Sequence, residues 1–377
     1  MVSKKSFLDL EKIKTELLKY GVKDVNSEIG KIEKQIKSAL NSCKEKNKIA
    51  RKQYKNAIPF SEIYDSIDKL NLPDWVQKKI NSARIFGKSK QMIIFPDGEK
   101  YQINNPLNNL SGGDWLNFTT SVFSTFYTTK GKDSYAHKIR KIHPSPKPPQ
   151  LMREIIEFFT KENEIIFDYF MGVGGSLLGA GLSKRKAIGI DLNEKFIKAY
   201  KNAAKEIGVD IFPTKCGDCL EIFNNEKEMK SLLNNEKISL VLLDPPYANM
   251  MNKEKTGGDI AIYGNNATPF TNDERDFGNL KQTVFFDSLK QSVEFVLPYM
   301  KKHGYIVLFI KDLQPNKKEL NLLHADIIKK LNEIPNLNYK GLRIWADRSA
   351  KLFPYGYPFS FVANQIHQYI LVFRKKK

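Results

Sequence analysis

Short apolar runs alternate with amphipathic stretches through the last two thirds of the chain. The runs lie at residues 164–168, 187–191, 210–214, 238–244 and 304–310. The amphipathic stretches between them lie near 176–183, 193–206, 220–234 and 283–302. Strands that alternate with helices predict βαβ units and a mostly parallel sheet. After a helix near 317–334, residues 337–346 and 368–374 supply two more strands, which are long enough to pair as an antiparallel edge.

The chain before this region shows other patterns. Leu and Ile recur at helical spacing within residues 6–56, and residues 92–103 predict a hairpin with an Asp-Gly turn. Residues 104–141 are rich in Asn, Ser, Thr, Gly and aromatic side chains, which is typical of a loop-dominated connector. We therefore predict two parts, a basic and mainly helical region at 1–130 and an α/β domain with a seven-stranded, Rossmann-like sheet at 131–377.

The composition adds a large excess of positive charge. Lys and Arg number 61 against 42 Asp and Glu, so the formal net charge at pH 7 is +19. Residues 1–140 alone carry 26 basic and 15 acidic side chains. This balance favours an anionic partner such as nucleic acid, although a general bias toward lysine would also produce it. The basic run at 44–55 is either a solvated helix face or a face that contacts phosphates.

The same composition excludes several classes of protein. No apolar run approaches the roughly 18 residues that cross a bilayer, and the amino terminus lacks the apolar stretch of a secretory signal. Three cysteines cannot form a disulfide framework, which favours a reducing compartment. We therefore expect a cytoplasmic protein without a membrane partner. Cys216 and Cys219 form one isolated CxxC pair, and the five histidines lack metal-ligand spacing, so no metal site is expected.

A glycine-rich turn follows the first strand of the α/β domain. The strand ends in Asp168, and Gly172, Gly174 and Gly175 then allow a tight turn and close approach to a ligand before the next helix. Dinucleotide enzymes share such a turn, so it is weak evidence alone. The second strand ends in Asp191, where an acid can accept hydrogen bonds from ribose hydroxyls; a helix cap is the alternative.

The fourth strand runs into Asp244, Pro245, Pro246 and Tyr247. The two prolines remove backbone donors and stiffen the chain at the carboxyl edge of the sheet, where open α/β sheets bind ligands. A carboxylate, a proline carbonyl and an aromatic face are then expected to project together. Such a set can hold an exocyclic amino group by two acceptors while the aromatic ring stacks on the base. A purely structural turn is the alternative interpretation.

Taken together, residues 137–377 resemble the DNA amino-methyltransferases. Asp244 to Tyr247 resemble the DPPY signature of that family, and residues 168–174 resemble its DPFxGxG turn, with Tyr169 where proline is usual. Residues 189–193 resemble its ribose-binding stretch. The resemblance implies a methyltransferase sheet and S-adenosylmethionine as the cofactor, with transfer of a methyl group to adenine N6 or cytosine N4.

The resemblance also implies a set of site residues. The catalytic ones are Asp244, Pro245, Pro246 and Tyr247. The segment with His143, Lys147 and Pro148 packs in the family against the methionine end of the cofactor, and Asp218 resembles the acid that reads the cofactor's adenine. The complete set of cofactor-binding residues that we expect is His143, Lys147, Pro148, Asp168, Phe170, Gly172, Gly174, Asp191 and Asp218.

We therefore expect a site-specific methyltransferase that acts on a flipped base in double-stranded DNA, with adenine N6 favoured because the signature begins with Asp. A restriction-modification setting with a separate cognate endonuclease is the expected context. Cytosine N4 methylation, RNA or tRNA guanine methylation and a catalytically silent DNA-binding subunit are the alternatives. Target recognition is assigned to region 1–130 or to the Gly- and Asn-rich insert at 248–282, which is otherwise a disordered loop.

Overall fold

The computed structural model of the chain describes residues 10–19, 24–30, 53–64, 70, 72–87, 89–248, 270–312, 322–354 and 357–376. Two compact units are present, Met1–Asn104 and Asn105–Lys377. No helix in the described ranges is long and apolar enough to cross a membrane. Most of the basic run at 44–55 and most of the insert at 248–282 lie outside the described residues.

The first unit contains a small antiparallel sheet in addition to helices. Helix α1 (Leu10–Lys19) and a helix at 25–30 precede it, and the sheet order is β1-β2-β3-β4. The strands are β1 (Ile58–Pro59), β2 (Arg84–Phe86), β3 (Met92–Ile94) and β4 (Lys100–Gln102), and α3 (Asp74–Lys78) packs beside them. The predicted hairpin is confirmed, since β3 pairs with β4 and Gly98 adopts a φ of +87° in the turn.

The second unit is built on an eight-stranded sheet in the order β5-β11-β12-β10-β9-β6-β7-β8. Its strands are β5 (Val122–Thr125), β6 (Ile165–Asp168), β7 (Lys186–Asp191), β8 (Thr214–Cys216), β9 (Ile238–Leu243), β10 (Met300–Ile310), β11 (Leu337–Asp347) and β12 (His367–Lys375). Among the described residues of this sheet, β12 alone runs antiparallel to its neighbours, and all other neighbouring strands are parallel. The Rossmann-like α/β fold is therefore confirmed.

Two details of the sheet differ from the sequence prediction. An eighth strand, β5, is added beside β11, so the predicted pair at the end of the chain does not form the edge. The antiparallel strand β12 lies between β10 and β11 and pairs with both over most of its length. The two final strands do pair antiparallel, as expected.

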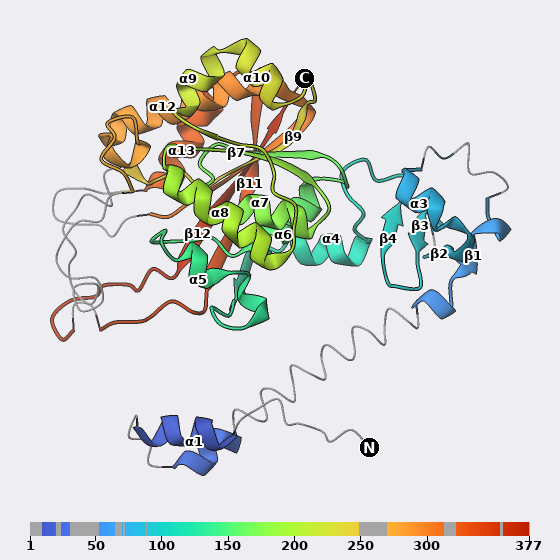
Figure 1. The fold of residues 1–377 in the computed structure, drawn as a ribbon, viewed down its shortest axis with the longest axis horizontal. Coiled ribbons are helices and arrows are strands. Elements are labelled where there is room, and N and C mark those ends of the chain that lie inside the picture. Colours follow the sequence, from blue (N-terminus) through green and yellow to red (C-terminus); the bar gives the residue numbers. More distant parts are fainter. Residues whose placement is uncertain are drawn as a thin grey trace. The chain divides into compact units, whose positions relative to one another are not determined.

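Helices cover both faces of this sheet (Figure 1). One face carries α6 (Pro149–Phe159), α7 (Gly175–Leu182) and α8 (Glu194–Ile207) over a core that includes Ile166, Leu240 and Phe309. The other face carries α9 (Cys219–Asn224), α10 (Glu226–Leu232), α12 (Gln282–Val296) and α13 (Leu323–Asn332) over a separate core. Because both faces are buried, the central strands are almost entirely apolar, as in β9.

The compact units divide earlier than the predicted boundary at residue 130, because residues 105–130 pack within the second unit. Helix α4 (Gly112–Phe118) places Trp115 and Phe118 on the core beneath α6. The Arg343 guanidinium lies 4.1 Å from the centre of the Phe118 ring and 4.0 Å from that of Phe123. The Asn108 side chain is fully buried and donates a hydrogen bond to the Phe158 carbonyl at 2.6 Å. The compact units therefore divide between residues 104 and 105.

Candidate active site

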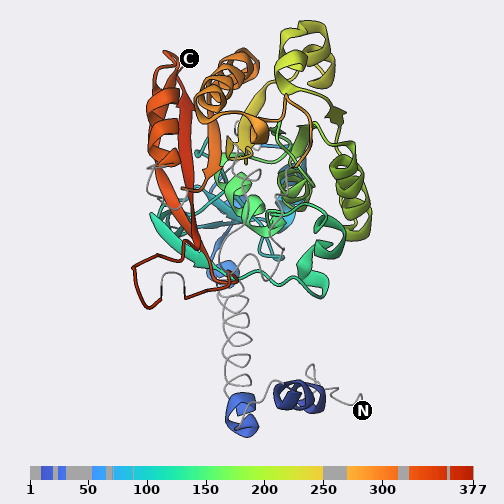
Figure 2. The same cartoon turned by 90° about the vertical axis from the view of Figure 1, so that its left-hand side faces the viewer.

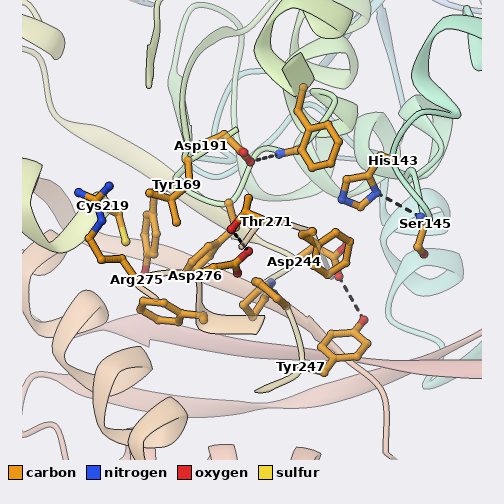
Figure 3. Close-up of a pocket in the computed structure, with 18 of the residues that line it drawn as sticks. His143, Ser145, Tyr169, Asp191, Cys219, Asp244, Tyr247, Thr271, Arg275 and Asp276 are labelled. Atoms are coloured by element: carbon orange, nitrogen blue, oxygen red, sulfur yellow. Dashed lines mark hydrogen bonds between the residues drawn. The ribbon is translucent and has the colours of Figure 1, made fainter. Parts of the chain in front are cut away.

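A pocket opens at the carboxyl edge of the sheet (Figure 3). The sequence-predicted residues that line it are His143, Lys147, Phe170, Gly172, Asp191, Asp218, Asp244, Pro245, Pro246 and Tyr247. A smaller cavity shares part of this wall and reaches Asp168. Pro148 and Gly174 line neither space. The fold therefore brings most of the predicted site together, although its parts are spread over a hundred residues of sequence.

Asp244 follows β9 and has a partner on each carboxylate oxygen. The Lys147 Nζ atom lies 2.5 Å from Oδ2, and the Tyr247 hydroxyl donates to Oδ1 at 3.2 Å. The exposed fractions of the Lys147 and Asp244 side chains are 7% and 19%, so this ion pair is shielded from water. Burial, together with the Asp244 charge, raises the pKa of Tyr247 well above its ordinary value, so its hydroxyl remains a donor. Lys147 thus contacts the expected catalytic acid.

Asp168 anchors the glycine turn from within the protein. Its Oδ1 atom accepts a hydrogen bond from the Phe170 backbone N–H at 3.0 Å, and its Oδ2 atom accepts one from the Ser176 hydroxyl. Burial raises the pKa of Asp168 to about 7. Gly174 adopts a φ of +74°, and a Cβ atom there would collide with the Tyr200 ring. Asp168 and Gly174 are therefore required by the shape of the turn.

Asp191 ends β7 and faces the pocket beside this turn. Its Oδ2 atom accepts from the Gly172 backbone N–H at 2.7 Å, and its Oδ1 atom accepts from the Asn193 N–H at 2.8 Å. Burial raises the pKa of Asp191 to about 6. These two bonds hold the carboxylate in place. Each oxygen has a second lone pair that can accept a hydrogen bond from a ligand hydroxyl.

Asp218 lies next along the pocket wall, at the start of α9. Its Oδ1 atom accepts from the Leu220 backbone N–H at 2.9 Å, which caps the helix. Burial raises the pKa of Asp218. The side chain lines the pocket as predicted, and its capping bond fixes the direction in which the carboxylate points. It can accept a hydrogen bond from a ligand with its remaining lone pairs.

His143 belongs to an aromatic wall of the pocket. Its ring stacks on Phe270 at a centroid distance of 4.9 Å and meets the Phe196 ring edge-on at 4.9 Å. Its Nδ1 atom accepts a hydrogen bond from the Ser145 backbone N–H at 3.1 Å. Burial lowers the pKa of His143 to about 4, so the ring is neutral near pH 7. This wall suits a flat or apolar ligand group.

One wall of the pocket comes from the last part of the insert at 248–282, which the sequence offered for target recognition without naming individual residues. It is formed by Phe270, Thr271, Arg275, Asp276 and Phe277. Asp276 fixes the segment, since its Oδ2 atom accepts from the Thr271 hydroxyl and its Oδ1 atom accepts from the Gly278 N–H, both at 2.8 Å. The only signal in the sequence was the unusual composition of the insert, which does not specify side-chain placement.

Two further pocket residues come from strands β10 and β12. Lys311 follows β10, and Gln368 is the second residue of β12. Within the described part of the chain, the Gln368 Oε1 atom is buried without a hydrogen-bond partner. A buried polar atom of this kind is normally satisfied, so its position at the pocket wall leaves an acceptor for a ligand. No sequence pattern pointed to either residue.

The sequence matches a known family of proteins. A family model described as DNA methylase, N6_N4_Mtase, matches residues 13–202 of the 377. The chain belongs to this DNA methylase family. Membership of this family supports S-adenosylmethionine as the cofactor. The acids, glycine turn and aromatic wall of this methylase family member fit that cofactor, which carries ribose hydroxyls, an adenine ring and a positively charged sulfur.

The comparisons also give individual relatives of this methylase family member. The tRNA (guanine(10)-N2)-dimethyltransferase of Pyrococcus abyssi is 32% identical over 104 residues, which are 28% of this chain and 29% of that protein. Type II methyltransferase M2.LlaDCHI of Lactococcus lactis subsp. cremoris is 38% identical over 73 residues, 19% of this chain and 26% of that protein. Among solved structures, TrmN from Thermus thermophilus shares 13% identity with a TM-score of 0.35, over 60% of this chain and 48% of that one.

Proposed function

We propose that this protein methylates the exocyclic amine of a base in double-stranded DNA, with adenine N6 as the target. The observation that supports this most strongly is the Asp244 carboxylate, held between Lys147 and Tyr247 at the mouth of a pocket lined by two proline residues. A type II methyltransferase among the relatives agrees with a DNA substrate. The net charge of +19 favours binding of the DNA phosphates.

The acids near the glycine turn are assigned to the cofactor. S-adenosylmethionine, when bound, supplies a methyl group on a positively charged sulfur. We assign Asp191 to accept hydrogen bonds from the ribose hydroxyls, and Asp218 to accept one from the adenine amine. The wall of His143 and Phe270 excludes water from the rest of the cofactor. Because His143 is neutral near pH 7, this wall adds no positive charge beside a cationic ligand.

The residues after β9 are assigned to the target base. The free lone pairs of Asp244 and the Pro245 carbonyl accept the two amine hydrogens, which orients the nitrogen lone pair toward the methyl group. The Tyr247 ring lines the same side of the pocket and can stack on the base. Lys147 compensates the Asp244 charge and fixes the position of its carboxylate. Catalysis in this arrangement comes mainly from orientation of the reacting groups.

Guanine N2 methylation in tRNA is the second candidate function. It is favoured by the 32% identity to the Pyrococcus abyssi tRNA methyltransferase, although that match covers 29% of the relative. Both candidate reactions place a methyl group on an exocyclic amine, so the Asp244 assignment applies to each. They differ in the base and in the nucleic acid that carries it. The choice between them therefore needs a direct assay.

The deciding experiment supplies the full-length protein with isotopically labelled S-adenosylmethionine and either duplex DNA of mixed sequence or total tRNA. Digestion and mass spectrometry then identify the methylated nucleoside. We expect N6-methyladenine from DNA and no product with Asp244→Ala. N4-methylcytosine would change the target base, and N2-methylguanine from tRNA alone would overturn the DNA assignment. We also propose that region 1–130 contributes to DNA recognition. A separate cognate endonuclease is the proposed biological context.

A further inference from the structure

A long connection at residues 348–366 leaves the sheet beside the pocket. It joins the end of β11 to the start of β12, and both ends lie at the carboxyl edge of β9 and β10. The connection ends at residue 366, and β12 begins at His367. The second residue of β12, Gln368, lines the pocket. Figures 1 and 2 both draw this connection as a red segment that extends away from the strands.

The base of this connection is held by several hydrogen bonds. The Asp347 N–H donates to the Ile366 carbonyl at 3.0 Å, and the Arg348 N–H donates to the Thr125 carbonyl at 2.9 Å. Farther out, the Asn364 side chain accepts from the Phe353 N–H at 2.9 Å and donates to the Phe353 carbonyl at 2.8 Å. These two bonds form a clasp, so the segment beyond it is presented from a fixed base.

Beyond the clasp, three aromatic rings face the solvent. Tyr357, Phe359 and Phe361 are exposed at 80%, 93% and 94%. Single exposed apolar residues are common on proteins, but three nearly fully exposed aromatic residues within five positions of one loop are unusual and indicate an interaction site. The connection also carries Arg348 and Lys351 and contains no Asp or Glu. We call Tyr357, Phe359 and Phe361 the aromatic tip.

We infer that the aromatic tip is a docking surface for the DNA strand that carries the target base, with its rings stacked on bases next to the target. This inference rests on the proposed function. A base that enters the pocket leaves unstacked neighbours at the pocket mouth, and the connection starts and ends at that same edge. Aromatic rings with nearby cations are the chemistry that binds unstacked bases and phosphates. The connection carries two cations and no acidic residue, which matches the phosphates of DNA better than it matches a protein partner.

The test uses the full-length protein with Tyr357, Phe359 and Phe361 all changed to Ser. The matched control changes Leu116 and Ile211 to Ser. These apolar side chains are also exposed, at 73% and 44%, and they precede the starts of β5 and β8, at the amino ends of the strands. DNA affinity is measured by anisotropy at one salt concentration, and cofactor affinity by calorimetry. We expect the aromatic-tip variant to bind duplex DNA at least about tenfold more weakly, since each stacked base contributes on this order. Cofactor affinity should change less than about twofold in either variant.

A second readout reports the stacking itself. Duplexes with 2-aminopurine beside the target position should show a fluorescence change with the wild-type protein and the control, and a much smaller one with the aromatic-tip variant. Asn364→Ala, which removes the clasp and keeps the rings, should weaken DNA binding by about threefold. Unchanged DNA affinity and fluorescence in the aromatic-tip variant would overturn the inference and leave a protein as the candidate occupant. Wild-type protein that neither binds nor methylates DNA would instead overturn the proposed function.

Discussion

Lys147 and Asp244 form a shielded ion pair, with Nζ 2.5 Å from Oδ2. The two residues come from different parts of the chain, the segment before α6 and the turn after β9. The Lys147 backbone is fixed by a hydrogen bond from Arg140 to its carbonyl at 2.8 Å, and Gly175 of α7 permits the close approach of this carbonyl. The lysine therefore lies where it can control the carboxylate assigned to the target amine.

We predict that Lys147→Met lowers the rate of methyl transfer by about a hundredfold, because a misplaced carboxylate no longer orients the amine. Cofactor affinity should change by less than about tenfold, since Lys147 contacts Asp244 and not the acids near the glycine turn. Single-turnover kinetics and calorimetry measure the two quantities. Lys147→Arg, which keeps the charge, should recover part of the rate. Normal turnover in Lys147→Met would show that the ion pair is only structural.

This pair also shows what the sequence could not predict. The strand-ending acids Asp191 and Asp244 were found because parallel strands end at one edge and their apolar runs are easy to recognise. The partner of Lys147 depends on how two distant segments pack in three dimensions. The resemblance placed Lys147 against the cofactor, and only the folded arrangement brings its ammonium group to Asp244.

Strand β5 was missed for a different reason. Val122 to Thr125 is a four-residue stretch within a polar connector, and it alternates between exposed and half-buried positions. Its place in the sheet comes from pairing with β11 and from the Trp345 indole, which donates a hydrogen bond to the Thr125 hydroxyl at 2.7 Å. The wall around Phe270 gave no periodic signal either, because it is a loop fixed by side-chain hydrogen bonds.

Asp191 provides a prediction about pH. Because burial raises its pKa to about 6, the carboxylate gains a proton as the pH falls through 6 and then loses an acceptor for the cofactor ribose. We expect cofactor affinity to fall below about pH 6 in the wild type. Asp191→Ala should weaken binding by about 1–3 kcal/mol at pH 8, because buried hydroxyls lose a charged partner.

Calorimetric titrations between pH 5 and 8 test this directly, with Asp191→Asn as the control of nearly equal shape. The variant should lose the pH dependence that comes from this group. The same raised pKa has a consequence for folding. The folded state binds the proton more tightly than the unfolded state, so the contribution of Asp191 to stability decreases as the pH rises from about 4 to about 6. A cofactor affinity in Asp191→Ala equal to that of the wild type would remove Asp191 from the site.

The position of the unit boundary predicts how truncations behave. Removal of residues 1–104 should leave a protein that unfolds cooperatively and binds S-adenosylmethionine, because the pocket residues all lie in the second unit. Removal of residues 1–130 should instead lower the melting temperature strongly or prevent folding. It deletes β5 and takes away Trp115, Phe118 and Phe123, which are partly buried against the core; full burial of one large apolar side chain contributes about 1.5–3 kcal/mol.

Thermal unfolding followed by circular dichroism, with and without the cofactor, distinguishes the two truncated proteins. Equal melting temperatures would contradict the assignment of residues 105–130 to the second unit. The shorter truncation also isolates the role of the first unit, since it leaves the aromatic tip and the pocket in place. Loss of DNA affinity in that protein with full cofactor binding would support a DNA-binding role for the removed residues.

The final prediction concerns the basic run at residues 44–55, which lies mostly outside the described residues. If its side chains contact phosphates, replacement of Lys44, Lys46, Lys48, Arg51 and Lys52 by Gln should weaken DNA binding and flatten its dependence on salt. Each lost phosphate contact reduces the slope of log affinity against log salt concentration by about one. The aromatic-tip variant should show nearly the wild-type slope, because stacking releases few counterions. The two variants therefore separate charge from stacking in one series of titrations. An unaltered slope in the glutamine variant, with normal cofactor binding, would mean that the run is a solvated face and that phosphate contacts come from other cations of the chain.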